Sequence, residues 1–253
     1  PGGRRDRPAR HRVTGGMGDE DSVEDASAIA GFYGRWAALY DRIATAPGVE
    51  RWRRVAAERT ATAGETVVEM GCGTGANLPY LRERVGPAGR VVGVDIAGPL
   101  LNRARERAAN YDNVSVVRAD AAAPPIDGAD AVLAAFVCGL FEEPAAVVDR
   151  WCDLVGPGGR VTLLDATASD DPRGRPFNPL FNSFVAAGSP SGDLRDVLRA
   201  PFGGTRTLSR RVDVSRAALA ARTVERRYET FGLGFVGLLS GTVERGSKSS
   251  GHL

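Results

Sequence analysis

The sequence of 253 residues contains only two histidines, three cysteines and a single lysine. His11 and His252 lie in segments that we expect to be tails, which removes Ser-His-Asp, Cys-His and histidine-metal chemistry from the working hypotheses. Cys72, Cys138 and Cys152 have neither Cys-x-x-Cys spacing nor an even number, so a disulfide framework or a zinc site is not expected. The sequence therefore predicts buried free thiols in an intracellular protein and no bound metal.

Long apolar runs are also missing. No stretch approaches the roughly 18 apolar residues of a membrane span, and the arginine-rich start lacks the apolar segment of a signal peptide. We expect a cytoplasmic protein with at most peripheral membrane contact. The chain has 33 basic against 31 acidic residues, and five of its arginines cluster in residues 1–16. The remainder has no basic excess, so no nucleic-acid partner is predicted.

A chain of this length can bury one sizeable core, which predicts a single domain. We place it at residues 26–245, between a disordered polar tail at 1–25 and a short tail at 246–253. From Ile29 to Ile43 apolar and aromatic residues recur at spacings of three and four, which is typical of a helix. Pro47-Gly48 breaks this pattern, and Val49–Arg59 is expected to form a second helix. The two helices would form an N-terminal helical cap.

From Glu65 onward, short β-rich runs alternate with helical segments, the pattern of a parallel sheet covered on both faces. The expected strands are Thr66–Met70, Arg90–Val94, Val114–Arg118, Ala129–Ala135 and Arg160–Asp165. The expected helices between them are Asn77–Val85, Pro99–Ala109 and Pro144–Val155.

The C-terminal part of the chain is less regular. Residues 166–222 are rich in Pro, Gly, Asp and Arg with weak periodicity, so an insertion or lid is expected there. Two β-like runs follow, Val224–Thr230 and Leu233–Val243, joined by a turn at Phe231-Gly232. They predict an antiparallel hairpin at the sheet edge. The expected fold class is therefore α/β, with a seven-stranded, mostly parallel sheet and helices on both faces.

The strongest local signal is Val67-Val-Glu-Met-Gly-Cys-Gly-Thr-Gly75, a strand followed by a Gly-x-Gly-x-Gly turn before a helix. Glycines allow a sharp turn and close approach of a ligand, and a helix N-terminus presents free N–H groups. Asp95 ends the next strand, where a carboxylate can accept both hydroxyls of a ribose. Glu69 and Asp120 add carboxylates at the ends of the first and third strands. These elements predict a nucleoside-cofactor crevice.

Two cofactors fit such a crevice. Gly71-Cys-Gly-Thr-Gly-Ala76 also satisfies a dinucleotide fingerprint, so a nicotinamide-dependent oxidoreductase is the first alternative. The negative charge of Glu69 at the loop entrance suits a ligand ammonium better than a pyrophosphate, and no Tyr-x-x-x-Lys pair or catalytic histidine is present. Charge complementarity therefore favours S-adenosylmethionine. A second alternative is a protein that binds this cofactor without turnover.

Several ordered motifs resemble those of class I S-adenosylmethionine-dependent methyltransferases. Besides the glycine turn and Val91-Val-Gly-Val-Asp-Ile96, they are Arg118-Ala-Asp120, Asp130-Ala-Val-Leu-Ala-Ala-Phe136 and Val155-Gly-Pro-Gly-Gly-Arg-Val-Thr-Leu-Leu-Asp165. The resemblance covers about residues 28–165 and implies a Rossmann-like fold with an antiparallel end. A weaker resemblance, Phe32-Tyr-Gly-Arg-Trp-Ala-Ala-Leu-Tyr-Asp41, is to the opening of quinone-ring C-methyltransferases and bacterial phosphatidylethanolamine N-methyltransferases. It implies a small or lipid-like acceptor, of quinol or phospholipid type.

The resemblance implies which residues bind the cofactor. They are Glu69, Gly71, Cys72, Gly73, Gly75, Asn77, Asp95, Ile96, Asp120, Ala121, Phe136, Tyr33 and Tyr40. Glu69 would face the ammonium and Asp95 the ribose hydroxyls, while Ile96 would pack on the adenine with Asp120 and Ala121 at its edge.

Other interpretations of these residues stay open. Ile96 and Phe136 could be plain core residues. Tyr33 and Tyr40, seven apart, could close over the cofactor or only dock their helix on the sheet. Asn77 could anchor the cofactor carboxylate or be a polar first-turn residue.

No catalytic residue is assigned from the sequence. Methyl transfer needs alignment more than a strong base, and Asp165 and Tyr33 are only weak candidates for one. The oligomeric state is not predicted.

Overall fold

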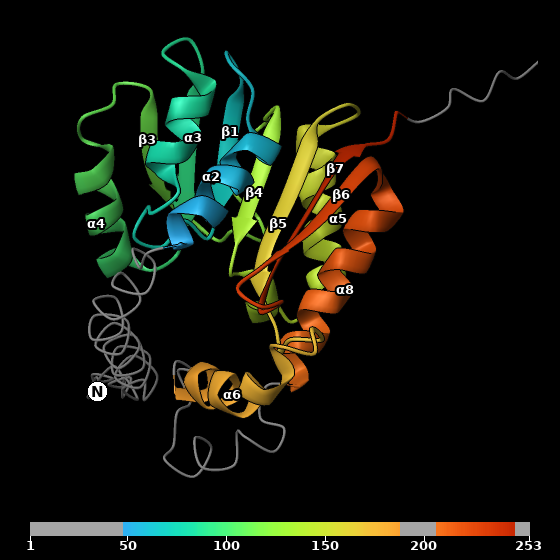
Figure 1. The fold of residues 1–253 in the computed structure, drawn as a ribbon. Helices are drawn as coiled ribbons and strands as arrows, with labels where there is room; N and C mark the ends of the chain where they lie inside the picture. The colour runs from blue at the N-terminus through green and yellow to red at the C-terminus, as the bar shows by residue number, and fades with distance from the viewer. Residues whose placement is uncertain (1–47, 188–205, 246–253) are drawn as a thin grey trace, which may run out of the picture.

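A computed structural model describes residues 48–187 and 206–245 of the chain (Figure 1). Tyr33, Tyr40 and the first helix of the expected cap lie outside these residues, as do both expected tails. The second cap helix is present as α2 (Val49–Thr60) and begins directly after Gly48.

Seven strands form one sheet in the order β3-β2-β1-β4-β5-β7-β6. The first five strands are parallel, and β7 runs antiparallel to both β5 and β6. Their bounds are β1 (Thr66–Met70), β2 (Arg90–Asp95), β3 (Val114–Arg118), β4 (Ala131–Ala135), β5 (Arg160–Ala166), β6 (Thr223–Phe231) and β7 (Val236–Val243). The predicted seven-stranded, mostly parallel sheet with an antiparallel end is confirmed.

Helices cover both faces of the sheet. Those described are α2, α3 (Leu78–Val85), α4 (Gly98–Ala108), α5 (Pro144–Val155), α6 (Asn178–Ala187) and α8 (Arg206–Arg222), with short 3₁₀ helices η1 (Cys138–Leu140) and η2 (Arg175–Phe177). One core lies between the sheet and α2, α3 and α4, and the other between the sheet and α5 and α8. Because side chains alternate along a strand, Val67 and Glu69 of β1 face the first layer, whereas Val68 and Met70 face the second.

The segment 166–222 differs from its expected role as an insertion or lid. Its second part, α8, packs along α5 and β7, and it places Val212 and Leu219 in the core. Weak periodicity concealed this helix because arginines, five of its 17 residues, interrupt its apolar pattern. Among the residues described, no helix combines the length and the apolar character needed to cross a bilayer.

After β3 the chain returns past β1 and forms β4 on its other side. The strand order therefore reverses between β1 and β4, which are adjacent although β2 and β3 intervene in sequence. Ligands of open α/β sheets bind at such a switch point, outside the carboxyl ends of the strands. In Figure 1 the carboxyl ends of β1, β4 and β5 share one edge of the sheet, the same edge at which α6 lies.

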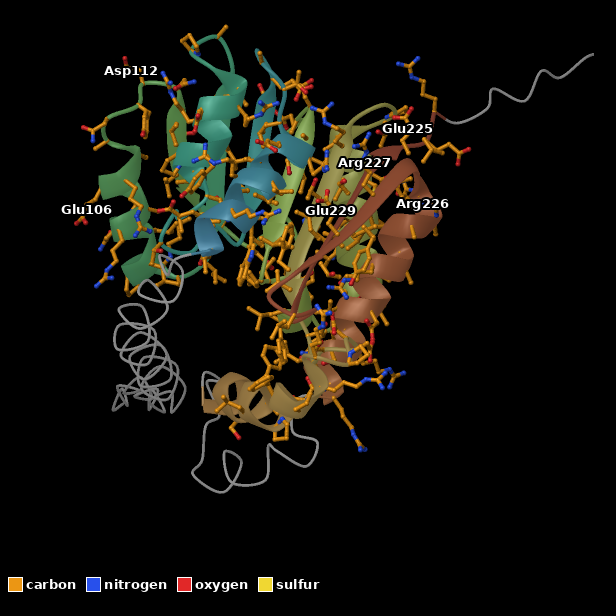
Figure 2. The ribbon with its side chains drawn as sticks, in the orientation of Figure 1. Glu106, Asp112, Glu225, Arg226, Arg227 and Glu229 are labelled. Atoms are coloured by element: carbon orange, nitrogen blue, oxygen red, sulfur yellow. The ribbon has the colours of Figure 1, made fainter. Side chains whose placement is uncertain are left out.

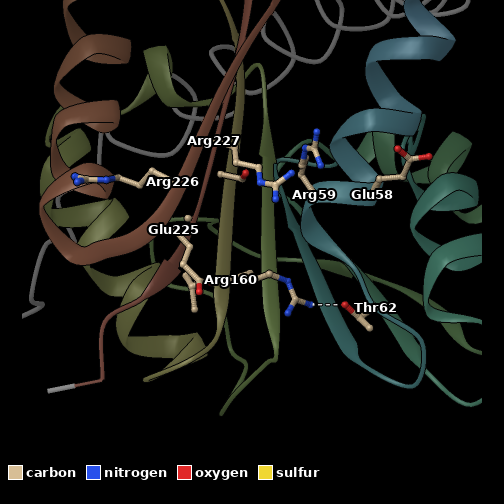
Figure 3. A pocket seen from close by; sticks show the side chains of 10 residues that line it. Glu58, Arg59, Thr62, Arg160, Glu225, Arg226 and Arg227 are labelled. Atoms are coloured by element: carbon tan, nitrogen blue, oxygen red, sulfur yellow. Dashed lines mark hydrogen bonds between the residues drawn. The ribbon is translucent and has the colours of Figure 1, made fainter.

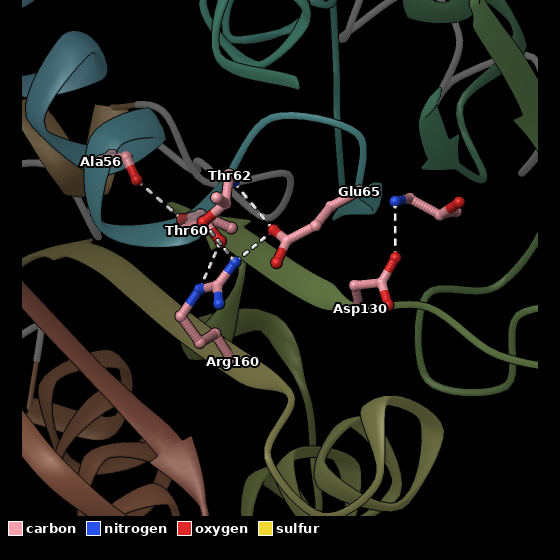
Figure 4. A network of polar contacts seen from close by, with 7 residues as sticks. Ala56, Thr60, Thr62, Glu65, Asp130 and Arg160 are labelled. Carbon is pink, nitrogen blue, oxygen red and sulfur yellow. Dashed lines mark hydrogen bonds and ion pairs between the residues drawn. The ribbon is translucent and has the colours of Figure 1, made fainter. Parts of the chain in front are cut away.

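The opposite edge of the sheet is tied together by polar contacts (Figure 4). Arg160 at the start of β5 donates to the Thr60 carbonyl (3.0 Å) and to Thr62 Oγ1 (3.1 Å), and it forms an ion pair with Glu65. Asp130 accepts the N–H of Thr66 at 2.8 Å. These contacts fasten the end of α2 to the sheet.

Candidate functional site

The glycine loop after β1 holds three glycines with positive φ, Gly71 (+68°), Gly73 (+55°) and Gly75 (+77°). A Cβ at Gly71 would lie 2.7 Å from the Val137 side chain, and one at Gly75 would lie 2.8 Å from the Leu78 side chain. A Cβ at Gly73 would meet nothing within 4 Å. Packing therefore requires the outer two glycines, whereas Gly73 borders open space in which a ligand can approach the backbone.

Asp95 joins the loop after β1 to the loop after β2. Its Oδ2 accepts the N–H of Gly73 and its Oδ1 accepts the N–H of Ala97, each at 2.8 Å. The carboxylate predicted to bind ribose hydroxyls thus also shapes the glycine loop. Ile96, the next residue, is 66% exposed, which does not fit a plain core role.

Glu69 is a buried carboxylate at the end of β1, with only 1% of its surface exposed. Its Oε1 accepts a hydrogen bond from Asn77 Nδ2 at 2.5 Å, whereas Oε2 has no hydrogen-bond partner among the described residues. Burial raises the pKa of Glu69 to about 7, and the Asn77 hydrogen bond and the Arg53 charge oppose that rise only in part. A cation that reached Oε2 would satisfy both the orphaned oxygen and the buried charge.

Asn77 is the N-cap of α3, at the helix start where it was predicted either to anchor the cofactor carboxylate or to be a polar residue of the first turn. It is buried, and its Oδ1 accepts a 2.6 Å hydrogen bond from Arg53 of α2 while its amide nitrogen donates to Glu69. It therefore orients Glu69, and both ends of its amide are engaged within the protein. Sequence reasoning missed Arg53, although its spacing of three and four from Val49, Ala56 and Ala57 places it on the buried stripe of α2.

Three other predicted residues make contacts within the protein. Cys72 is buried beneath the loop with its sulfur against Gly93 of β2, so its side chain does not face the crevice. Asp120 is exposed and accepts the N–H of Ala122 at 2.8 Å. The carbonyl of Ala121 accepts from Trp151 Nε1 at 2.8 Å, which fixes the loop after β3 to α5.

Phe136 follows β4 with φ of +58°, a conformation that side chains other than glycine rarely adopt. Its N–H donates to the Leu164 carbonyl of β5 at 2.7 Å, and the next residue, Val137, packs against Gly71. The strained backbone is held by contacts on both sides, and such strain is common where a binding surface is shaped.

Asp165, the weak candidate for a base, lies at the end of β5 but is 2% exposed and faces the α5 and α8 layer. Burial raises the pKa of Asp165 to about 6, and the charge of Arg216 opposes that rise only in part. The structure thus places Asp165 beneath η1 and away from Glu69, which faces the opposite layer. The other candidate, Tyr33, lies outside the described residues.

A groove of about 550 Å³ opens at the far edge of the sheet, between α2, β5, β6 and β7 (Figure 3). Several arginines line it, but Arg59 is paired with Glu229 at 2.6 Å and Arg160 with Glu65. No residue of the glycine loop lines the groove, and two of its four arginines are neutralised by these acids.

Comparisons with known proteins agree with this arrangement. Residues 67–159 match a family model described as a methyltransferase domain. Nocamycin O-methyltransferase of Saccharothrix syringae is 38% identical over 139 residues, 52% of this chain and 48% of that protein. The chain thus spans about half the length of that relative. The solved structure of the N-methyltransferase NodS from Bradyrhizobium japonicum, in complex with S-adenosyl-L-homocysteine, aligns with a TM-score of 0.53 and 15% identity, over 81% of this chain and 91% of NodS.

A further relative matches over most of its own length. Demethylmenaquinone methyltransferase of Thermus thermophilus is 32% identical over 195 residues, which cover 72% of this chain and 86% of that protein. These comparisons support the S-adenosylmethionine interpretation rather than the nicotinamide alternative. The chain belongs to the class I S-adenosylmethionine-dependent methyltransferases, and its cofactor is S-adenosylmethionine.

Proposed function

We propose that the protein transfers a methyl group from S-adenosylmethionine to a small amphiphilic acceptor, of quinol type first and phospholipid type second. Two observations carry the cofactor half of this proposal: Glu69 Oε2 is buried with no hydrogen-bond partner among the described residues, and the backbone of Gly73 borders open space. An ammonium group supplies what that oxygen lacks, whereas a pyrophosphate would be repelled by it.

Different residues of the crevice bind different parts of the cofactor. Glu69, held by Asn77, takes the ammonium of the cofactor, and the backbone around Gly73 accommodates the methionyl part. Asp95 accepts the ribose hydroxyls with the lone pairs not used by Gly73 and Ala97. Ile96 offers its exposed side chain to the adenine, with Asp120 and Ala121 at the adenine edge. Tyr33 and Tyr40 remain predicted to close the site.

When bound, the cofactor supplies an electrophilic methyl group on a sulfonium, which already carries its leaving group. The protein then has to align the acceptor atom with that methyl group and exclude water. Phe136 is suited to this task because its strained backbone holds the residue between β4 and β5, at the same edge as Gly71. We assign no base, because Asp165 is enclosed beneath η1.

An apolar rim at the carboxyl edge of the sheet supports an amphiphilic acceptor. Leu140 of η1, Phe177 of η2, Leu180 of α6 and Leu233 of the β6–β7 turn are each at least half exposed. The rings of Phe181 and Phe235, 5.0 Å apart, join α6 to that turn. Exposed apolar groups around a crevice suit a ligand with a hydrocarbon part. The similarity to demethylmenaquinone methyltransferase supports testing a quinol as the first acceptor.

The test has two stages. Calorimetric titration with S-adenosylmethionine, S-adenosylhomocysteine, NAD and NADP should show binding of the first two only. Transfer of a labelled methyl group is then measured with a ring-demethylated menaquinol in detergent and with phosphatidylethanolamine vesicles. Turnover of the quinol supports the proposal, and turnover of the phospholipid alone reverses the order of acceptors. Binding without turnover of either acceptor would instead favour a protein that binds the cofactor without catalysis.

A further inference from the structure

The glycine loop after β1, residues 71–75, has little stiffness of its own. Gly71, Gly73 and Gly75 make up three of its five residues, and glycine loses more conformational freedom on folding than any other residue. A ligand that binds a loose loop has to order it first, and the cost of that ordering is subtracted from the affinity. A loop that presents its backbone to a cofactor therefore benefits from contacts that fix its shape before the cofactor arrives.

Two contacts already described or internal to the loop hold part of it. Asp95 of β2 accepts the N–H of Gly73 at 2.8 Å, and the Gly75 N–H donates to the Cys72 carbonyl at 2.8 Å. Neither contact uses the carbonyl or the side chain of Thr74, which lies between the last two glycines and is only 2% exposed. These two buried acceptors need another donor.

The donor is an arginine of α4. Arg107 Nη1 donates to the Thr74 carbonyl and to Thr74 Oγ1, each at 2.7 Å. One guanidinium nitrogen thus constrains both the peptide group that follows Thr74 and the torsion of its side chain. Hydrogen bonds from a charged donor are shorter and stronger than those between neutral groups. This contact therefore fixes the loop at the residue that the other two leave out.

The same face of α4 also packs against the loop. A Cβ at Gly75 would lie 3.0 Å from the Ala104 Cβ, and Ala104 lies three residues before Arg107, on the same side of the helix. Glu106, the neighbour of Arg107 in sequence, is exposed and points away from the sheet (Figure 2). Helix α4 thus contacts the loop at two positions of one face, by packing at Gly75 and by hydrogen bonds at Thr74.

The sequence alone does not distinguish Arg107 from other arginines of its helix. The chain has a single lysine, so arginine supplies nearly all of its positive charge, including the charge exposed to solvent. Arg105 has this ordinary role: it is exposed and donates to Asn102 of the same helix at 3.0 Å. Arg107 is instead half-buried and reaches a residue 33 positions earlier in the chain.

We propose that Arg107 is a positioning residue for S-adenosylmethionine, which acts through Thr74 to hold the glycine loop in its binding shape before the cofactor arrives. Arg107 contacts the loop at buried Thr74, whereas the open space for the ligand lies at Gly73. The loop is therefore ordered without binding energy from the cofactor, which raises the affinity. This inference rests on the proposed placement of the cofactor over Gly73 and is independent of the acceptor.

The test is a double-mutant cycle of Arg107→Gln and Thr74→Val, with Arg105→Gln as the matched control. Thr74→Val keeps the branched shape of the side chain and removes only Oγ1. Arg105→Gln removes the same charge from the same last turn of α4 without touching the loop. Three quantities are measured: the dissociation constant of S-adenosylhomocysteine, the unfolding temperature of the free protein, and amide hydrogen exchange of residues 71–75 with and without S-adenosylhomocysteine.

Arg107→Gln should raise the dissociation constant by about tenfold, the scale of hydrogen bonds to a charged group, and Thr74→Val by about threefold. The double variant should lose little more than Arg107→Gln alone, because both changes break the same contact. In free Arg107→Gln the 71–75 amides should exchange faster, and saturation with S-adenosylhomocysteine should restore their protection. Arg105→Gln should change none of these quantities.

Two results would overturn the role of Arg107. An unchanged dissociation constant in Arg107→Gln, even with a lower unfolding temperature, would assign it to stability alone. Losses that add in the double variant would mean that Arg107 acts by its charge and not through Thr74. If Arg107→Gln does not fold, Thr74→Val alone decides, and unaltered affinity and exchange in that variant would count against the proposal.

Gly73→Ala separates this inference from the placement of the cofactor. If Gly73→Ala binds S-adenosylhomocysteine as tightly as the original protein, the placement over Gly73 is overturned, and the inference falls with it. If Gly73→Ala loses affinity while Arg107→Gln keeps it, only the role of Arg107 is overturned. Loss of affinity in both variants, with intact affinity in Arg105→Gln, is the result we expect.

Discussion

Asn77 donates its side-chain amide to Glu69 across 2.5 Å, and this single contact determines which carboxylate oxygen remains available. Because Arg53 holds the other end of the amide, Asn77 cannot rotate to offer its oxygen instead. Asn77, the N-cap of α3, and Arg53 of α2 therefore together hold the Glu69 side chain in place. A helix preceding the sheet thus orients this carboxylate through a buried arginine.

Glu69→Gln should stabilise the protein without cofactor at pH 8 by about 1–3 kcal/mol. The folded-state pKa of Glu69 is raised from 4.5 to about 7, so the stability that its protonated form contributes is complete below about pH 4.5 and is lost as the pH rises through 7. Glutamine removes this penalty. Urea unfolding at pH 5 and pH 8 should show the gain at pH 8 only. Glu58→Gln, an exposed position of α2, is the control, and an equal gain at both pH values would contradict the assignment.

Binding of S-adenosylhomocysteine should weaken as the pH falls below about 7, by up to about tenfold per pH unit. The ammonium requires ionised Glu69, and the free protein holds a proton there below its pKa of about 7. Titrations at pH 6 in two buffers of different ionisation enthalpy should reveal proton release on binding. Glu69→Gln should bind weakly at every pH. An affinity that is the same at pH 6 and pH 8 would place the ammonium elsewhere.

Alanine at two glycines of the same loop should have opposite consequences. Gly73→Ala should cost about 1 kcal/mol in stability through its positive φ, yet lose most cofactor affinity, because its Cβ enters the open space of the crevice. Gly71→Ala should cost about 2–4 kcal/mol, since its Cβ meets Val137 at 2.7 Å. Thermal unfolding and calorimetry measure the two effects. Tight binding by Gly73→Ala would mean that the cofactor does not lie over that residue.

Asp95→Ala should weaken cofactor binding by about 1.5–3 kcal/mol, the scale of hydrogen bonds to a charged group. Part of the loss should come from the glycine loop, since Gly73 and Ala97 lose their acceptor. Asp95→Asn keeps one acceptor oxygen and should lose less. Asp112→Ala serves as the control, because Asp112 is exposed in the loop between α4 and β3 (Figure 2). Cofactor affinity is measured by calorimetry, on variants whose near-ultraviolet circular dichroism shows an unaltered fold. Undiminished affinity in Asp95→Ala would remove this residue from the site.

The architecture was predictable because its signals are local. Five parallel strands were predicted from the hydrophobic runs in β1, β2 and β5 and from the glycines in the turns between elements. Their predicted bounds lie mostly within one or two residues of those observed. The α8 helix was missed because its sequence is rich in arginine and only Val212, Ser215 and Leu219 are buried. Its position depends on contacts with α5 and the sheet rather than on its own pattern.

The sequence by itself determined the glycine loop, the carboxylates Glu69 and Asp95 that follow their strands, and the family to which they belong. These features are set by residue type and spacing at strand ends, so they can be read along the chain. Only the tertiary structure decided that Arg53 holds Asn77, that Asp165 is buried, and that Gly73 alone among the three glycines of the loop faces open space. Each of these depends on elements that are distant in sequence, and the packing of helices on the sheet brings them together.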